Sequence, residues 1–411
     1  MRYLLIVLLS VHLFAVDATL KIEKDVEQRS RIAIEDASAA KDAQFFKILL
    51  SDFKISGHFL ADTTYHKGSM DSMLISPSFK GKEYLLKYLL TKGGGAKLMI
   101  RLLRISDNKE IFKKSYAISS TSKVPFLAHK AISDVNKVLK YKDISWINRY
   151  VLFSRYTTAK HSEILLADYT FNYKKTIIKG GLNLFPKWAD AEQKSFYYTS
   201  YSGLIPTLFK LNIYTGAKKK IASSDGMLIC SDVSKNKSKI LLTMAPNGQA
   251  DIYELNVATG VKTRVTKFNG IDVGGKYVND DTIIFVSNRL GYANVFKKSI
   301  HGASVNQVVH HGRNNNACDA YGSKVVYSSR ESKNSFAANK FNLYLTSTSG
   351  TDTRPLTTTG TNQFPRFSPD GSVVLYIKHA GNGSSIGYIN LESRQTQLYP
   401  LGGLKIQSID W

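Results

Sequence analysis

Residues Phe364–Tyr376 have the sequence FPRFSPDGSVVLY, in which a Ser-Pro-Asp-Gly turn leads into the short apolar run Val373–Tyr376. Four runs of the same kind come earlier in the chain: Phe196–Thr199, Ile240–Thr243, Ile283–Val286 and Val325–Ser328. The five runs start 44, 43, 42 and 48 residues apart. A period in the forties is typical of four-stranded propeller blades, because one small sheet cannot bury its faces until neighbouring sheets stack around an axis. The repeat therefore predicts a β-propeller.

A second strand-like segment follows four of these runs and ends in a glycine turn. These segments are Leu208–Gly216, Ile252–Gly260, Val295–Gly302 and Leu343–Gly350. Glycine supplies the positive φ that a tight turn requires. Three of the turns lead into basic, β-branched stretches, which we expect to be the outer strands of their blades: 218–221, 262–266 and 353–357.

A sixth unit begins near Tyr150 but has no inner strand before it. The chain's tail, Gly403–Trp411, supplies a match, since Trp411 takes the place that Trp188 and Phe367 have in other blades. We expect the tail to pair into the first blade and close the ring, which removes two exposed sheet edges. The predicted fold is a six-bladed β-propeller over residues 148–411.

The start of the chain has the features of a secretory signal peptide. Arg2 precedes an apolar run, Tyr3–Phe14, that is too short to span a membrane as a helix, and a small residue follows at Ala18. We expect cleavage after Ala18 and export of the remaining chain to an extracytoplasmic compartment. The alternative is a buried helix or strand at the N-terminus.

Residues 19–144 have a different pattern of apolar residues, which predicts a small α/β domain. Arg31–Glu35 alternates as a strand does, and Ser38 could cap a helix that ends at Gly57. The remaining elements expected here are a helix over Glu83–Leu90, a hairpin of Ala96–Ile105 with Glu110–Tyr116, and a last helix over Lys123–Leu139.

The chain is strongly basic, with a formal net charge of +24. Lys and Arg occur along every blade, so in an exported protein we expect solvated outer strands and no nucleic-acid surface, with attraction to an anionic envelope surface or an acidic partner left open. The two cysteines, Cys230 and Cys318, fall at the entrances of inner strands in blades that are not adjacent. We therefore expect two buried thiols and no disulfide.

Signal peptide, small α/β domain and propeller together resemble the TolB family of the Tol–Pal system. Three segments carry the resemblance: Ser51–Phe59, Gly94–Ile100 and Phe364–Gly371. One blade alone keeps Ser-Pro-Asp-Gly intact, and Val138–Tyr141 replaces the family's Leu-Thr-Gly boundary, which marks a divergent member. The resemblance implies a periplasmic adaptor without enzymatic activity. It would bind the lipoprotein Pal at the propeller mouth and the inner-membrane protein TolA through its N-terminal segment, and so support outer-membrane integrity and constriction during cell division.

Loops entering the inner strands converge at one end of the channel, where amide-rich segments predict the partner surface. Aligning the inner strands places Met227, Asp272, Asn316 and Asn362 at equivalent positions of this mouth. The full set of residues that we expect to contact a Pal-like protein is Met227, Asp272, His311, Arg313, Asn315, Asn316, Asn362 and Gln363. Alternatively, the amides only cap turns. The segment expected to contact a TolA-like protein is Thr19, Leu20, Lys21 and Ile22, whose alternation suits strand addition to a partner sheet.

An enzymatic reading finds little support in the motifs. Gly383–Gly387 matches Gly-x-Ser-x-Gly, but no His follows His379, so a hydrolase triad cannot be completed in the usual order. The adjacent pair His310 and His311 lacks the spacing that places two imidazoles on one helical face, so we expect no metal site and no cofactor. A propeller that binds glycan or peptidoglycan remains the alternative function.

Overall fold

The computed structural model describes residues 29–330, 332, 340–381, 383–403 and 405–411. The chain forms two compact units. The first contains residues up to 121 together with 134–142, and the second contains residues 122–133 together with 143–411. The expected signal peptide and the segment Thr19–Ile22 lie outside the described residues.

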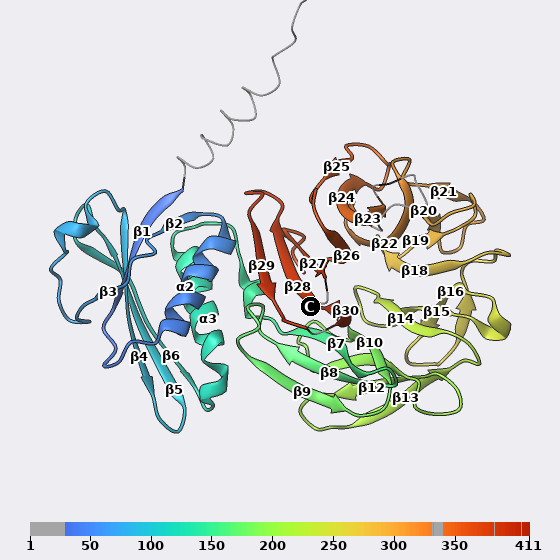
Figure 1. Ribbon diagram of the computed structural model, residues 1–411, viewed down its shortest axis with the longest axis horizontal. Coiled ribbons are helices and arrows are strands. Elements are labelled where there is room, and N and C mark those ends of the chain that lie inside the picture. Colours follow the sequence, from blue (N-terminus) through green and yellow to red (C-terminus); the bar gives the residue numbers. More distant parts are fainter. Residues whose placement is uncertain (1–28, 331, 333–339, 382, 404) are drawn as a thin grey trace, which may run out of the picture. The chain divides into compact units, whose positions relative to one another are not determined.

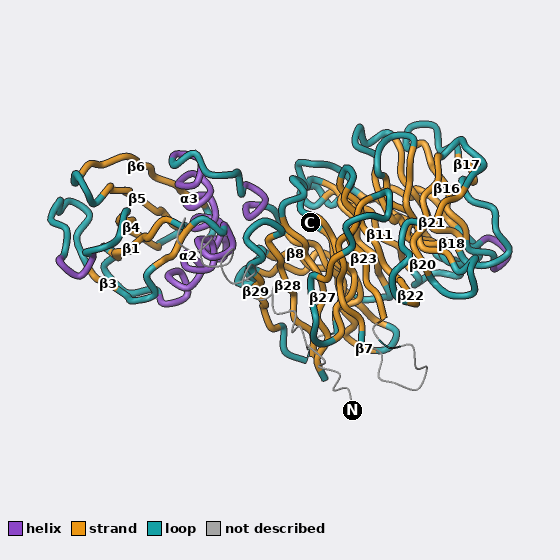
Figure 2. The backbone as a smooth tube through the Cα atoms, turned by 90° about the horizontal axis from the view of Figure 1, so that it is seen from above, coloured by secondary structure: helices purple, strands orange, loops and turns teal. Residues whose placement is uncertain are grey.

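The first unit is built on a mixed sheet whose strands run in the order β2-β1-β4-β5-β6, with β3 also paired to β1. The strands are β1 (Ser30–Asp36), β2 (Phe59–Ala61), β3 (His66–Lys67), β4 (Tyr84–Lys92), β5 (Ala96–Arg104) and β6 (Lys109–Ile118). Strand β1 runs parallel to β2, β3 and β4, and the β5–β6 hairpin continues the sheet in antiparallel pairing. Helix α2 (Ala43–Ser56) lies on one face of this sheet (Figure 2).

Two expectations for this unit are corrected. The N-cap of α2 is Asp42, whose carboxylate accepts a hydrogen bond from the Phe45 N–H, and not Ser38. Glycine does end the helix, with Gly57 in the left-handed region at φ 79°. The segment Glu83–Leu90 is strand β4 and not a helix. A central strand covered on both faces is apolar at nearly every position, and this pattern resembles that of a buried helix.

The second unit is a six-bladed propeller of four-stranded antiparallel sheets, as the repeat predicted (Figure 1). Blade 1 combines β30 (Ile406–Asp410) with β7 (Val151–Thr158), β8 (His161–Ala167) and β9 (Lys174–Lys179). Blade 2 contains β10 (Asn183–Trp188), β11 (Ser195–Ser200), β12 (Thr207–Asn212) and β13 (Lys218–Ser223). Blade 3 contains β14 (Leu228–Val233), β15 (Lys239–Met244), β16 (Asp251–Asn256) and β17 (Lys262–Arg264).

The other three blades follow in chain order. Blade 4 contains β18 (Asp272–Tyr277), β19 (Thr282–Ser287), β20 (Asn294–Ser299) and β21 (Val305–Gln307). Blade 5 contains β22 (Arg313–Tyr321), β23 (Lys324–Arg330), β24 (Phe341–Ser347) and β25 (Arg354–Pro355). Blade 6 contains β26 (Thr361–Phe367), β27 (Val373–Ala380), β28 (Gly383–Asn390) and β29 (Thr396–Pro400). Helix α3 (Val124–Val138) begins in this unit.

The C-terminal strand closes the ring as expected. Strand β30 pairs antiparallel with β7, and the C-terminus lies near the centre of the blades (Figure 1). The Trp411 indole N–H donates to the Phe367 carbonyl at 2.7 Å, which ties the first blade to the sixth. Alternating apolar residues of neighbouring blades fill the space between the sheets; Tyr197, Leu208 and Ile240 are examples and are fully buried.

The Ser-Pro-Asp-Gly segment is the turn between β26 and β27. The Ser368 hydroxyl donates to Asp370, and both side chains accept hydrogen bonds from the Ser372 N–H. Gly371 has φ 67°, and a Cβ there would lie 2.1 Å from the Tyr321 ring of blade 5. Only glycine satisfies both the backbone conformation and this close approach between blades.

Candidate functional site in the propeller channel

The inner strands place one charged side chain each at the same position around the channel. In blade order, from blade 1 to blade 6, these residues are Asp410, Lys187, Asp232, Lys276, Asp319 and Arg366. The sign alternates at every step, so odd blades carry an acid and even blades carry a base. We call these six residues the charge ring. The sequence analysis did not find it.

The carboxylates of the ring connect the blades in pairs. The Asp410 carboxylate accepts a hydrogen bond from the Trp188 N–H at 2.9 Å. In the same way, the Tyr277 N–H donates to Asp232 at 2.9 Å, and the Phe367 N–H donates to Asp319 at 2.8 Å. In each case the donor is the backbone N–H of the residue directly after the basic ring residue of the next blade. The same contact therefore occurs three times around the channel.

Among the described residues, ion pairs between blades involve five of these six residues, all except Arg366. The Lys187 ammonium lies 2.9 Å from Asp410 and 3.4 Å from Asp232, and so contacts an acid on each side. The Lys276 ammonium lies 3.7 Å from Asp319 and donates to the Ser231 carbonyl at 2.6 Å. Because the ring contains three acids and three bases, its formal charge is zero.

The surroundings shift the ionisation of these groups in different directions. Burial opposes the charged form of Lys187, but the carboxylates of Asp410 and Asp232 raise its pKa above the ordinary value. Lys276 is 2% exposed, and burial together with the charges of Arg366 and Lys187 lowers its pKa to about 8. Burial alone would raise the pKa of Asp232, but Lys187 and Lys276 hold it below the ordinary value.

Local backbone geometry turns the basic residues into the channel. The register of the inner strand slips before the ring position in all six blades; the slips of the even blades lie between Leu184 and Lys187, Val273 and Lys276, and Gln363 and Arg366. Each of these three slips contains a residue with positive φ: Phe185 at 56°, Gly274 at 66° and Phe364 at 54°. A bulge changes which face of the strand a side chain occupies, so a regular alternation pattern cannot locate these residues.

A cavity of about 260 Å³ occupies the channel beside the ring. Residues from all six inner strands line it, including Phe185, Ile229 and Val273 on its apolar walls. All three basic ring residues contribute to the lining, whereas the three ring carboxylates do not. The cavity therefore combines apolar walls with the basic side chains of the charge ring.

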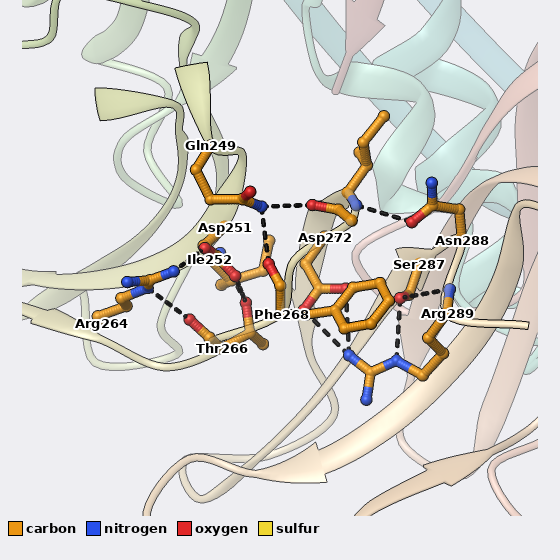
Figure 3. Close-up of polar contacts among 12 residues, drawn as sticks. Gln249, Asp251, Ile252, Arg264, Thr266, Phe268, Asp272, Ser287, Asn288 and Arg289 are labelled. Carbon is orange, nitrogen blue, oxygen red and sulfur yellow. Dashed lines mark hydrogen bonds and ion pairs between the residues drawn. The ribbon is translucent and has the colours of Figure 1, made fainter. Parts of the chain in front are cut away.

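At the mouth, the predicted residue Asp272 is fully buried and forms an ion pair with Arg289 at 3.0 Å (Figure 3). The Arg289 guanidinium also donates to the Ser287 hydroxyl. Figure 3 shows a second network beside it, in which Asp251 interacts with Arg264 and Thr266. These carboxylates hold the mouth loops in position and are not available at the surface.

Two further predicted residues are also buried. The Asn362 amide donates to the Asn342 side chain and to the carbonyls of Phe341 and Thr359. The Asn315 amide donates to the Asn294 side chain and to the His311 carbonyl. Both asparagines therefore stabilise the mouth loops through buried hydrogen bonds.

The alignment of inner strands was one residue wrong in two blades. Asp272 and Asn362 lie four residues before the ring charge of their strands, and in blades 3 and 5 that position belongs to Leu228 and Asn315. Met227 and Asn316, which the sequence analysis placed there, are the neighbours of these residues. A shift of one residue moves a side chain to the other face of a strand.

The remaining predicted residues reach the surface to different degrees. Met227 is 43% exposed, and His311 and Arg313 are exposed, whereas Asn316 and Gln363 are half-buried. The Arg313 guanidinium lies over the Tyr292 ring, 5.5 Å from its centroid. The His311 ring lies against Tyr344, with the ring centroids 4.3 Å apart.

Exposed apolar side chains gather around this mouth. The loops that begin or end there include Met227 (43% exposed), Ile271 (51%), Leu290 (53%) and Tyr292 (40%). The strand registers place a further loop of blade 2 at the same end, and its Leu204 is fully exposed. Several exposed apolar side chains at one end of a domain are typical of protein interaction sites.

Other candidates from the sequence have structural roles. Cys230 and Cys318 are free, buried thiols, as expected, and burial raises the pKa of Cys318 to about 12. The segment Gly383–Gly387 lies in strand β28 and forms no nucleophile elbow. Within the described ranges, no cluster of His, Cys, Asp and Glu could hold a metal ion, and no helix is both long and apolar enough to cross a membrane.

The chain is similar to a family model, to curated relatives and to a solved structure that share the name TolB. Residues 147–411 match the family model described as the TolB beta propeller domain. A Tol-Pal system protein TolB from Wolinella succinogenes is 43% identical over 410 residues, 97% of each chain, and one from Helicobacter hepaticus is 40% identical over 416 residues, 99% of each chain. The crystal structure of TolB from Acinetobacter baumannii has a TM-score of 0.76 at 20% identity, covering 93% of this chain and 96% of that one, which supports the fold alone.

Proposed function

The chain belongs to the TolB family, and from this membership and the geometry of the channel mouth we propose that it is a periplasmic adaptor of the Tol–Pal system. Its propeller mouth binds a Pal-like lipoprotein, and its N-terminal segment binds a TolA-like inner-membrane protein. The adaptor supports outer-membrane integrity and constriction during division. The proposal includes no catalytic step and no cofactor.

The observation that carries this proposal is the apolar surface around the mouth. Met227, Ile271, Leu290 and Tyr292 come from blades 3 and 4 and are each at least 40% exposed. Large exposed apolar residues surrounded by polar loops are typical of the centre of a protein interface. The cavity behind them can accept one partner side chain, and the basic ring residues at its end favour an acidic tip on that side chain.

The predicted contact residues take two roles in this proposal. One group contacts the partner in the proposal, and its exposed or half-buried position supports this role; it consists of Met227, His311, Arg313, Asn316 and Gln363. The buried residues Asp272, Asn315 and Asn362 support the loops that carry them.

The N-terminal segment Thr19–Ile22 provides the second contact in the proposal. Its alternating side chains suit addition as a strand to a sheet of the TolA-like partner. Deleting Thr19–Ile22 should abolish binding to the TolA-like protein and leave binding to the Pal-like protein unchanged. If the truncated protein still bound the TolA-like partner, this part of the proposal would be wrong.

The mouth is tested by calorimetric titration of the purified protein with the Pal protein of the same organism. Replacing Ile271 or Met227 by Asp places a charge at the centre of the interface, and we expect binding at least about 30-fold weaker, since a central residue contributes about 2 kcal/mol. Leu398→Asp is the matched control, because Leu398 is 44% exposed on the outer strand β29. Equal effects of all three substitutions would contradict the proposal, and retention of muropeptides in place of the lipoprotein would favour a glycan-binding propeller.

A further inference from the structure

The outer strands of blades 1, 2 and 3 carry an unusual density of positive charge. Strands β9, β13 and β17 contain no acidic residue. Their exposed basic residues are Lys174, Lys175, Lys179, Lys218, Lys219, Lys220, Lys262 and Arg264. We call these eight residues the basic belt. The first lysine of each strand recurs at a constant spacing, at 174, 218 and 262, so the belt follows the blade repeat along the rim.

The other half of the propeller lacks this feature. The outer strands β21 and β29 of blades 4 and 6 contain no charged residue, and β25 of blade 5 contains only Arg354. A general need for solubility would distribute charge over all six outer strands. Basic residues occur along every blade, but in the outer strands they are concentrated on three adjacent blades, and this concentration needs another explanation.

Most of the belt's charge is not compensated within the molecule. Arg264 forms an ion pair with Asp251. In the part of the chain that the structure describes, none of the seven lysines of the belt has a carboxylate within 4 Å. The ammonium of Lys218 instead lies 3.8 Å from the centroid of the Phe209 ring. Most of the belt's ammonium groups are therefore exposed to solvent without a carboxylate partner among the described residues.

Exposed apolar side chains accompany the charge on the same blades. Tyr214 is 67% exposed and Val261 is 61% exposed, in the turns that lead into β13 and β17. The equivalent turn of blade 1 contains Phe171, which is 6% exposed. The strand registers place both turns at the end of the propeller opposite the mouth. A ligand of the belt would therefore leave the mouth accessible.

We propose that the basic belt, with Tyr214 and Val261 at its edge, docks the protein on an anionic phospholipid surface. Lysines next to an anionic bilayer add to its attraction for a protein, and neighbouring aromatic and aliphatic side chains enter the interfacial region. A nucleic acid or another polyanion would be attracted by the charge, but it would not be bound more tightly by the apolar side chains of Tyr214 and Val261.

The test measures cosedimentation of the purified protein, without the expected signal peptide (residues 19–411), with vesicles of phosphatidylcholine, with and without phosphatidylglycerol. The belt variant carries Lys175→Glu, Lys219→Glu and Lys262→Glu, one substitution in each blade. The matched control carries Lys47→Glu, Lys54→Glu and Lys97→Glu, three exposed lysines of the first unit that give the same change in net charge. Thermal unfolding confirms that each variant is folded.

We expect binding to require phosphatidylglycerol, to weaken with salt and to fall at least about tenfold in the belt variant, with the control close to wild type. A second variant, Tyr214→Ser with Val261→Ser, should reduce vesicle binding without changing binding to a duplex DNA probe. Equal losses in belt and control variants would overturn the proposal, because net charge alone would then explain binding. An unchanged response to the Tyr214 and Val261 substitutions would also overturn it and indicate a general polyanion surface.

Discussion

Lys187 shows how much of this propeller depends on single charges. Its ammonium group contacts Asp410 of blade 1 and Asp232 of blade 3, so one side chain joins three blades. Neither partner is near it in sequence, and the bulge that turns Lys187 inward starts at Leu184. The charges of the ring are visible in the sequence, but their common position depends on bulges that a regular alternation of side chains does not describe.

The first prediction concerns the loss of this contact. Lys187→Met should lower the free energy of unfolding by about 3 kcal/mol, because it leaves the buried Asp410 and the half-buried Asp232 without their shared partner. Lys175→Met is the control and should change stability by less than about 0.5 kcal/mol, because Lys175 is exposed and unpaired among the described residues. Urea denaturation followed by circular dichroism measures both. Similar values for the two variants would show that the ring does not hold the blades together.

The second prediction uses the pKa of Lys276, which burial and the neighbouring Arg366 and Lys187 lower to about 8. The unfolded chain keeps a lysine pKa of about 10.4. Between these values the unfolded state binds more protons than the folded state, so this residue makes stability rise with pH. Below about pH 8 both states are protonated, and the destabilising effect of the buried charge is fully present.

We therefore compare wild type with Lys276→Met at two pH values. The free energy of unfolding of wild type, relative to the variant, should increase by about 2 kcal/mol from about pH 7.5 to about pH 9.5. Titration of the tyrosines cancels in this difference, because both proteins contain all of them. A difference that stays constant with pH would mean that the Lys276 pKa is not lowered.

The strands and helices could be predicted from the sequence to the extent that their hydrophobic patterns differ. Apolar runs such as Val373–Tyr376 repeat with the blades, and the match of Trp411 to Trp188 identified the closing strand. Strand β4 could not be distinguished from a helix, because both of its faces are covered. The residues at the mouth could be placed only approximately, since a shift of one residue decides whether the mouth position belongs to the buried Asn315 or to the half-buried Asn316.

The third prediction concerns the closing strand. Trp411 is 6% exposed and packs against Trp146 and Tyr388, with ring centroids 5.1 and 5.5 Å apart. Trp411→Ala should lower the free energy of unfolding by about 3–5 kcal/mol, through the cavity and the lost hydrogen bond to Phe367. Trp411→Phe keeps a ring and should lose only about 1–2 kcal/mol. If the alanine variant were as stable as the phenylalanine variant, ring closure would not depend on this side chain.

The boundary between the two units does not coincide with the end of an element. The family match begins at residue 147, yet residues 122–133, the first part of helix α3, belong to the propeller unit. The His129 imidazole lies 3.2 Å from the Asp168 carboxylate, and both side chains are fully buried. Burial raises the pKa of Asp168, but hydrogen bonding and the charge of His129 lower it overall. The propeller thus includes a helix that its repeat does not reveal.

The last prediction follows from this boundary. A fragment of residues 122–411 should unfold cooperatively, whereas a fragment of residues 143–411 should be less stable by about 3 kcal/mol or more. The shorter fragment loses His129, the partner of Asp168, and exposes the ring surface of Tyr173 that Phe126 covers.

In the full chain, His129→Ala should be destabilising by a similar amount. Lys130→Ala, at the exposed next position, should be destabilising by less than about 0.5 kcal/mol. Because the folded pKa of Asp168 is lowered, its contribution is present above the ordinary carboxyl pKa and disappears as the pH falls through the folded value. Equal stability of the two fragments would place the start of the propeller after α3 and leave His129 a residue of the linker.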